Sequence, residues 1–349
     1  MMGQITTRMG DGSFISLSPD DIKKEIELGV QEAVIKAKIA SLTKEEMDQL
    51  YEIIAQPRKF VSVERGNELV LSYDSAPMKF TRLGIPIDRS AILLIYERAL
   101  AADTLEMAYV HYSMKNIKIN LSEEVAPLAM ALLNTTAPLM YGAMPNMGLY
   151  YKPDGPCDNA AELFPLGKIG EAQAAQEEAA NYLEQDIMLV ASAMYEAGAD
   201  GFDFDTTASA GDAEFYAVLN AVTKLREKYP DIGIEIGMSG EFVLGFHGEL
   251  KYDGKRLAGM YPHDQVKVAE KAGATIFGPV VNTKSNKTFP WNLARAVTMC
   301  KACGEVANIP VHANVGMGVG GVPMVITTPA DCVSRVSTAM AQIAKMDGL

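Results

Sequence analysis

The sequence predicts an α/β protein: a (β/α)8 TIM-barrel-like core, incomplete at its C-terminus, with an N-terminal helical and hairpin extension. From about residue 90, short apolar strand candidates alternate with longer helical segments, which is typical of right-handed βαβ units and a parallel sheet. Several strand candidates end in Asn, Asp, Thr or Gly, which favours a barrel with chemistry at its carboxyl rim over the alternative, an open doubly wound sheet. We therefore place a cap in residues 1–90 and βα units, without the final strands, in 91–349.

The N-terminal part begins with two capped helices. The run Ser18-Pro19-Asp20-Asp21 starts one helix and Thr43-Lys44-Glu45-Glu46 starts the next, each with a capping side chain and acids in the first turn. Apolar and polar residues then alternate over 59–74 around Arg65-Gly66-Asn67, which predicts a hairpin. These elements form the predicted cap or oligomer arm, and we expect a homo-oligomer.

The βα units follow in order, roughly six where a closed barrel needs eight. Gly198 and Gly273 each stand just past a helix and just before a strand, as helix-terminating glycines do. The expected strands are 104–113, 137–144, 198–207, 232–240, 274–283 and 309–318, and the expected helices are 121–134, 170–197, 212–228, 263–272, 291–307 and 329–346.

Composition excludes several classes of function. The net charge of −13 argues against nucleic acid as a partner, because a phosphate backbone needs a surface rich in Lys and Arg. Four cysteines in 349 residues do not make a disulfide framework. The N-terminus does not read as a secretory signal, and no run of about 18 apolar residues predicts a membrane span. We expect a cytoplasmic protein without a membrane partner.

Carboxylates at strand ends are the first candidate site residues. In GFDFDTT, Asp203 and Asp205 share one strand face, and Asp205 is nearer the carboxyl end, where barrel sites assemble. Glu235 lies within an apolar strand, where burial can raise a carboxyl pKa enough for base chemistry. Glu241 is expected at the rim. The alternative is structural: a carboxylate that caps a loop, or a buried Glu that is paired.

Two loops are candidate walls of a pocket. Residues 141–156 combine Met144, Asn146 and Tyr150 with a Pro-Asp-Gly-Pro turn, and either wall a flat apolar ligand or pack as an ordinary surface loop. Residues 311–323 are the richest in glycine. There His312 and Asn314 share a strand face, and Gly316 and Gly318 permit close approach of a large group.

Nucleotide and metal sites are not expected. The glycines of 316–321 do not open a helix at once, as a GxGxxG phosphate loop must. The four histidines stand alone, without HExxH or paired ligands at helical spacing. Cys300 and Cys303 form a CxxC within a helical segment, which we interpret as packing on a helix face.

Five long motifs resemble the dimethylamine–corrinoid protein methyltransferases, a pyrrolysine-containing family. The resemblance runs from RMGDG at 8–12 to the last residue. The motifs are YGAMPNMGLYY (141–151), AGADGFDFDTTASAGDAEFY (197–216), GEFVLGFHGELKYDG (240–254), ATIFGPVVNTKSNKTFPWNLARAVT (274–298) and HANVGMGVGGVPM (312–324).

The resemblance implies where the family's unusual residue belongs. In that family an in-frame amber codon, translated as pyrrolysine, follows Asp-Gly-(Ile/Leu), and this chain ends Asp347-Gly348-Leu349. We therefore expect pyrrolysine directly after Leu349, and the sequence to be an amber-truncated form without the last barrel strands. The chain itself is expected to bind no cofactor, because the corrinoid cobalt belongs to a partner protein.

The implied activity is transfer of a methyl group from dimethylamine to the Co(I) corrinoid of its cognate corrinoid protein, releasing monomethylamine, in methanogenesis from methylamines. By strand-end position, Glu235 and Asp205 would handle the proton, and Asn282 and Asn314 would orient the adduct. Met144, Asn146, Tyr150, Glu241, His312, Gly316 and Gly318 would line the substrate and corrinoid rim.

Two other interpretations stay open at this point. One is an inert truncation product that at most binds the corrinoid protein. The other is an unrelated barrel lyase or aldolase that acts through a carboxylate or through a Schiff base on Lys284 or Lys287.

Overall fold

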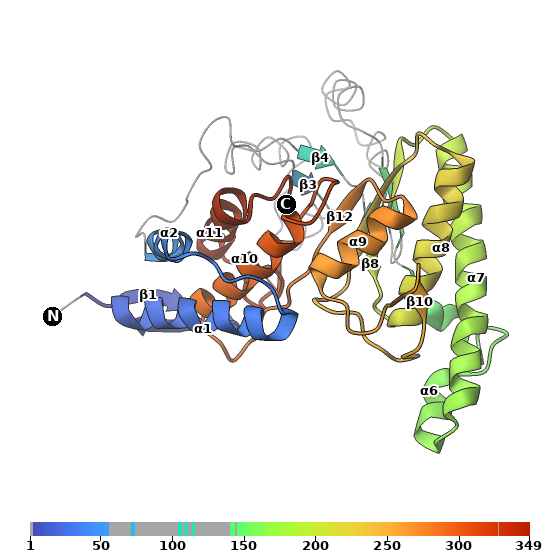
Figure 1. Cartoon of the computed structure of the whole chain (residues 1–349), viewed down its shortest axis with the longest axis horizontal. Coiled ribbons are helices and arrows are strands. Elements are labelled where there is room, and N and C mark those ends of the chain that lie inside the picture. The colour runs from blue at the N-terminus through green and yellow to red at the C-terminus, as the bar shows by residue number, and fades with distance from the viewer. Residues whose placement is uncertain are drawn as a thin grey trace, which may run out of the picture. The chain divides into compact units, whose positions relative to one another are not determined.

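The computed structural model of the protein describes residues 3–55, 71–73, 104–106, 109–110, 114–115, 140–143, 145–326 and 328–349. The expected hairpin at 65–67, the expected helix 121–134 and Met144 lie outside these ranges. The described residues form two compact units. One joins those of Met1–Ser72 to those of Gly278–Leu349, and the other holds those of Glu106–Phe277 (Figure 1). The domain boundary at residue 90 stays a prediction.

A six-stranded sheet is the core of the second unit, in the order β12-β9-β8-β7-β6-β5. β7, β8 and β9 run parallel, which confirms the predicted parallel strands at 137–144, 198–207 and 232–240. β5 and β6 instead pair antiparallel at one edge, so the sheet is mixed. Closure into a (β/α)8 barrel stays a prediction. The strands are Tyr109–Val110 (β5), Met114–Lys115 (β6), Met140–Ala143 (β7), Gly201–Thr207 (β8), Gly233–Met238 (β9) and Ile276–Gly278 (β12).

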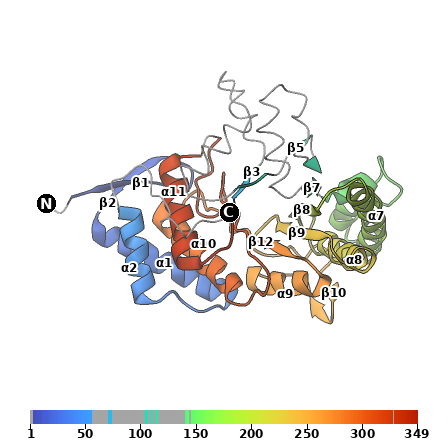
Figure 2. The same ribbon diagram turned by 90° about the horizontal axis from the view of Figure 1, so that it is seen from above.

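Helices α7 and α8 of this unit lie side by side in both views (Figures 1 and 2). α7 buries a stripe at helical spacing, with Ala172, Ala175, Ala179 and Leu183 on it. α9 ends at Gly273 in the left-handed conformation, as predicted. The elements are η2 (Met147–Tyr150), α6 (Ala160–Leu163), η3 (Phe164–Leu166), α7 (Ile169–Glu196), α8 (Asp212–Lys228), β10 (Lys251–Tyr252), β11 (Lys255–Arg256) and α9 (Pro262–Ala272).

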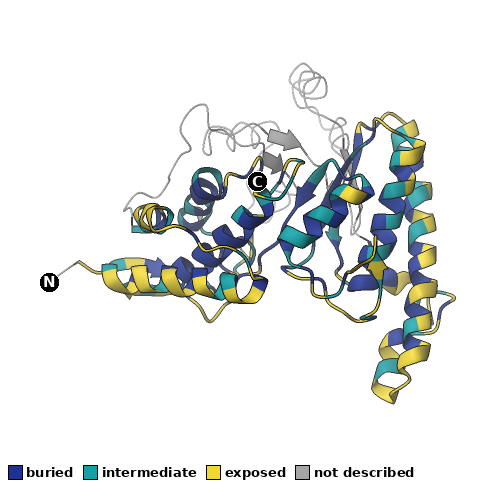
Figure 3. Ribbon diagram, viewed as in Figure 1, coloured by how far each residue is buried: buried dark blue, intermediate teal, exposed yellow. Residues whose placement is uncertain are grey.

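The first unit is built around α10, which Figure 3 colours dark blue over most of its length. α1 packs on it closely, because a Cβ at Gly29 would stand 2.3 Å from the carbonyl oxygen of Trp291. Both predicted N-terminal helices are confirmed, and Ser18 forms a capping box with Asp21. The elements are β1 (Ile5–Arg8), β2 (Phe14–Leu17), α1 (Pro19–Ala37), α2 (Lys44–Ala55), α10 (Phe289–Gly304), α11 (Ala330–Ala339) and η4, a π-helical turn (Met340–Ala344). A separate two-stranded sheet pairs β3 (Leu71–Tyr73) with β4 (Thr104–Glu106).

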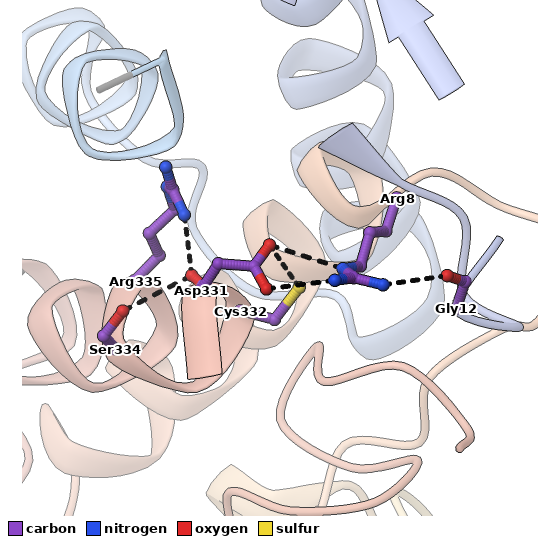
Figure 4. Close-up of polar contacts among 6 residues, drawn as sticks. All are labelled: Arg8, Gly12, Asp331, Cys332, Ser334 and Arg335. Atoms are coloured by element: carbon purple, nitrogen blue, oxygen red, sulfur yellow. Dashed lines mark hydrogen bonds and ion pairs between the residues drawn. The ribbon is translucent and has the colours of Figure 1, made fainter. Parts of the chain in front are cut away.

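The β1–β2 hairpin, which the sequence did not predict, is tied to α11 by a forked ion pair. Arg8 donates through Nε and Nη2 to the two carboxylate oxygens of Asp331, both at 3.3 Å, and its Nη1 donates to the carbonyl oxygen of Gly12 (Figure 4). The same guanidinium lies 4.2 Å from the ring centre of Phe14. Arg335 donates to the backbone oxygen of Asp331 at 2.8 Å. One aspartate thus joins residues more than three hundred positions apart.

Candidate functional site

A row of carboxylates lies on adjacent strands of the second unit. In the parallel register Asp203 pairs with Glu235, and both are buried, at 2% and 4% exposure. Their apolar neighbours Phe202 and Phe204 alternate with the acids along β8, as the period of two predicted. Two acids therefore meet on one face of the sheet, where burial of charge is costly unless it is partnered or used.

Asp205 joins this row through a β-bulge. The register of β8 on β9 shifts between Phe204 and Thr207, so that two residues of β8 stand opposite one of β9. That one residue is Gly237, and a Cβ placed there would lie 3.4 Å from Oδ1 of Asp205 and 3.7 Å from Oδ1 of Asp203. These are ordinary van der Waals distances, so the carboxylates of Asp203 and Asp205 both lie beside the same position of β9. Bulges of this kind often re-aim side chains beside active sites.

The backbone after the bulge is strained. Thr206 and Ala208 both have positive φ, at 60° and 67°, a region that residues with a Cβ rarely adopt. Such conformations persist only where their surroundings hold them, and they concentrate at functional sites. The Oγ1 of Thr207 donates to the carbonyl oxygen of Phe204 at 2.8 Å, and the amide of Ser239 donates to the carbonyl oxygen of Thr207. The ends of β8 and β9 are thus bonded to each other.

Two buried acids on the first turn of α8 hold the loops at this edge, and sequence reasoning did not select them. Glu214 accepts hydrogen bonds from the amides of Ser209 and Ala210 at 2.9 and 3.3 Å. Asp212 accepts from the amides of His247 and Gly248 at 2.9 and 2.7 Å. A signal was available for Glu214. It occupies the third helical position, where an acidic side chain commonly reaches back to amides before the helix.

Burial sets the ionisation of Glu214. The side chain is fully buried, and desolvation raises its pKa to about 7 against the opposing effect of its amide and hydroxyl donors. Tyr151 lies close enough that Glu214 contributes to its electrostatic environment, and burial raises the pKa of that phenol to about 12. Tyr151 is therefore neutral at physiological pH, and Glu214 is the group that titrates there.

The predicted residues of the 141–156 loop have local partners. Asn146 caps η2, accepting from the amide of Gly148 at 3.0 Å. The hydroxyl of Tyr150 donates to Asp186 of α7 at 2.7 Å, its ring stacks on Tyr182, and burial with the Asp186 contact raises the Tyr150 pKa. These contacts agree with the alternative that the loop packs as an ordinary surface loop, and its role at the rim of a site stays a prediction. Glu241 is buried, at 9% exposure, in the segment after β9.

The other predicted residues lie in the first unit, on three adjoining segments. The amide of Asn314 donates to the carbonyl oxygen of Pro279 at 3.2 Å, so residues 279–282 flank 311–314. On the other side His312 pairs in parallel with Gly348, and the amide of Val311 donates to the Asp347 carboxylate at 2.8 Å. The expected strand at 309–318 is therefore present only as isolated bridges.

Asn282 and Asn314 are exposed on these segments, and His312 is half-buried. Buried Arg295 of α10, at 1% exposure, donates to the carbonyl oxygen of Asn282 at 3.2 Å. The backbone on which Asn282 stands is thus fixed from within the core. Both amides face solvent from a firm backbone, an arrangement suited to hydrogen bonding with a small polar ligand.

The glycine-rich loop folds back onto the segment that carries Asn282. Gly320 donates to the carbonyl oxygen of Val281 at 2.9 Å. Gly318 and Gly321 have φ of +79° and +94°, and a Cβ at Gly321 would stand 2.9 Å from the Cα of a leucine in α10. Packing within the protein therefore explains these glycines. Gly316 differs, because a Cβ there would meet nothing within 4 Å, so its surroundings are open.

Within the described part of the chain, no three His, Cys, Asp or Glu side chains are grouped as a metal site would require. Cys300 and Cys303 are buried on α10, in agreement with packing, and burial raises the pKa of the Cys300 thiol to about 12. Of the helices in the described ranges, none is long and apolar enough to cross a membrane.

The model of the family described as dimethylamine methyltransferase (Dimeth_PyL) matches residues 3–349. Among solved structures the chain is similar to the homocysteine methyltransferase MmuM from Escherichia coli. The apo form has a TM-score of 0.33 at 12% identity, with 79% of this chain and 96% of that chain covered. The metallated form has a TM-score of 0.30 at 13% identity, with 78% and 96% covered.

Proposed function

Because the chain belongs to the dimethylamine methyltransferase family, we propose that it transfers a methyl group from dimethylamine to the cobalt of a corrinoid carried by a partner protein, with release of monomethylamine. The protein is a methyltransferase by family, and the match over residues 3–349 is the observation that carries the proposal. What the described residues add is a chemical role for each part of the candidate site.

The carboxylates of the second unit are suited to the substrate's charge. An aliphatic ammonium has a pKa well above 7, so dimethylamine arrives protonated, and its nitrogen can act as a nucleophile only after the proton leaves. Asp205, at the bulge, and Glu235, beside Asp203, can attract the cation and accept that proton. We assign proton handling to Asp205 and Glu235.

The amides of the first unit are suited to orienting a bound amine. Asn314 follows His312 by two positions on the segment that is bonded to Asp347 and Gly348. The pyrrolysine expected after Leu349 would supply an electrophilic imine for the amine nitrogen. Asn314 and Asn282 are side chains that can hydrogen-bond beside such a group, and their exposure permits it. We assign orientation to these two residues.

The corrinoid of the partner protein would approach the site past the predicted rim residues. Gly316 is surrounded by open space, and Met317 beside it is half exposed, at 50%. A bulky macrocycle can approach a backbone that carries no side chain. We therefore keep Gly316 as a rim residue, while the rim roles of His312, Tyr150 and the buried Glu241 stay predictions.

The test is a methyl-transfer assay on the protein made by its native host, after measurement of its intact mass and C-terminal peptide. We expect a product longer than 349 residues that carries a lysine-derived residue after Leu349. We expect it to methylate a reduced corrinoid protein from dimethylamine, and to do so faster than from trimethylamine or monomethylamine. A native protein of the expected mass that methylates no corrinoid protein from dimethylamine would overturn the proposal.

A further inference from the structure

The first turn of α8 stands at the carboxyl edge of the sheet, between two loops. One loop, residues 208–211, joins β8 to α8, and the other begins after Met238 at the end of β9. Because β8 and β9 are parallel, both loops leave the sheet at the same edge. Asp205 lies on β8 shortly before the first loop, and Glu241 lies in the second loop, so each loop adjoins or contains a candidate carboxylate.

Each loop is held by its own buried carboxylate. Glu214, on the side toward the first loop, accepts from the amide and hydroxyl of Ser209 and from the amide of Ala210. Asp212 accepts from the amides of His247 and Gly248 in the second loop, and its own amide donates to the carbonyl oxygen of Leu244 at 2.8 Å. Both acids are 0% exposed.

The surroundings reinforce both contacts. His247 also bonds through Nε2 to Glu177 of α7 at 2.8 Å, and its carbonyl oxygen accepts from Gln173 at 2.8 Å. The positive end of the α8 dipole favours negative charge on the first turn. Charge-assisted hydrogen bonds to backbone amides are among the strongest that a loop can make. The strained φ angles of Thr206 and Ala208 lie directly beside the first loop, where such bonds are needed.

We propose that Asp212 and Glu214 are positioning residues of the methyl-transfer site, which together fix the loop that follows Asp205 and the loop that contains Glu241. This inference rests on the proposed function for its catalytic consequence, but the loop contacts are independent of the reaction. Glu214 holds Ser209 and Ala210, in the loop that follows the bulge at Asp205. Asp212 sets the course of the segment after β9.

We call the hold of Asp212 and Glu214 on the two loops the clamp. Amide hydrogen exchange on the native protein tests this clamp without reference to activity. Glu214→Gln should speed exchange at Ser209 and Ala210 by about tenfold or more, because hydrogen bonds to a charged acceptor are lost, and leave Gly248 unchanged. Asp212→Asn should do the reverse. Glu227→Gln, an exposed acid on the same helix, is the matched control and should change neither loop. Equal effects of both variants on both loops, or no effect, would overturn the clamp.

A pH series separates positioning from general loosening. Among the described residues, Tyr151, which stays neutral, interacts electrostatically with Glu214, and Asp212 stands on the same turn of α8. Relative to intrinsic rates, exchange at Ser209 should quicken as the pH falls through about 7, as Glu214 gains its proton. Glu214→Gln should abolish this dependence, and its persistence in the variant would contradict the inference.

Kinetics then connect the clamp to the reaction. With dimethylamine and the corrinoid protein, Glu214→Gln should lower kcat by about tenfold while KM changes less than about twofold, because positioning of a proton acceptor acts on the chemical step. Unchanged kinetics with a released loop would refute the positioning role. Should the wild type transfer no methyl group while both loops respond as expected, the proposed function fails and the clamp stands.

Discussion

Glu214 is expected to make the protein less stable as the pH rises. Its pKa moves from the usual 4.5 to about 7 on folding, so between these values the folded protein holds a proton that the unfolded chain has released. Stability falls with pH wherever the folded state binds more protons. The contribution is therefore complete below about pH 4.5, is lost as the pH rises to about 7, and is constant above that.

The magnitude follows from the same two values. A pKa raised from 4.5 to about 7 corresponds to about 3 kcal/mol of differential free energy. Glutamine has nearly the shape of glutamic acid and carries no charge at any pH. Glu214→Gln therefore removes the cost of ionising a buried carboxyl. The free energy of unfolding of the variant minus that of the wild type should rise by about 3 kcal/mol between pH 4.5 and pH 8. Any constant effect of the amide cancels in this difference.

Urea unfolding followed by far-UV circular dichroism at pH 5, 6, 7 and 8 measures the difference. Glu227→Gln on the same helix is the control, because an exposed acid has no such cost, and its difference from the wild type should stay flat. A difference between Glu214→Gln and the wild type that does not change with pH would refute the reasoning. So would a difference that changes in the opposite direction.

Three further predictions concern other parts of the molecule. Glu235→Gln should lower kcat for methyl transfer by about 100-fold or more, as loss of a general base does, and should leave the urea unfolding midpoint unchanged. A smaller loss of kcat would show that Glu235 is not the general base. Asp331→Asn should lower the free energy of unfolding in urea by about 1 kcal/mol, because it breaks the forked ion pair with Arg8. Arg8→Lys should lower it by less. Equal stability of the wild type and Asp331→Asn would contradict this. Gly321→Ala should destabilise by about 1 to 3 kcal/mol because of its φ and its close neighbour in α10, while Gly316→Ala, in open space, should be tolerated; the reverse order would refute the packing explanation.

The central fold was predictable because its signals are local. Strand and helix alternate from β8 to α10 with glycine or proline at several junctions. β8, α8, β9, α9, β12 and α10 each lie near an expected position, whereas the short pair β10–β11 was not predicted. β5 lies within the expected strand 104–113, but its antiparallel pairing with β6, and the β1–β2 hairpin, were not predicted. The β5–β6 pairing depends on contacts between segments, and the β1–β2 hairpin depends on turn geometry that the residues at 9–13 do not indicate.

The site was predictable where it follows strand periodicity. A period of two put Asp203 and Asp205 on one face, but their register against Glu235 depends on how two strands align, and the bulge at Asp205 has no sequence signature. The partner of Tyr150 is Asp186, thirty-six positions away, which no local pattern indicates. Sequence reasoning therefore finds candidate acids more readily than it finds what holds them.

The ionisation of Glu214 bears on why a buried acid stands there. A glutamine could fill the same space without a cost of about 3 kcal/mol above neutral pH, so stability alone does not favour the carboxylate. The side chain of a glutamine, however, would turn its N–H groups toward one of the two backbone amides from which Glu214 accepts hydrogen bonds. Glutamine would therefore hold the loop beside the strained Ala208 less firmly. Proteins commonly accept lower stability where a site needs a fixed geometry. A variant that is more stable at pH 8, exchanges faster at Ser209 and turns over more slowly would show that trade directly. A variant that gains stability with no change in exchange or turnover would leave the carboxylate without a positioning role.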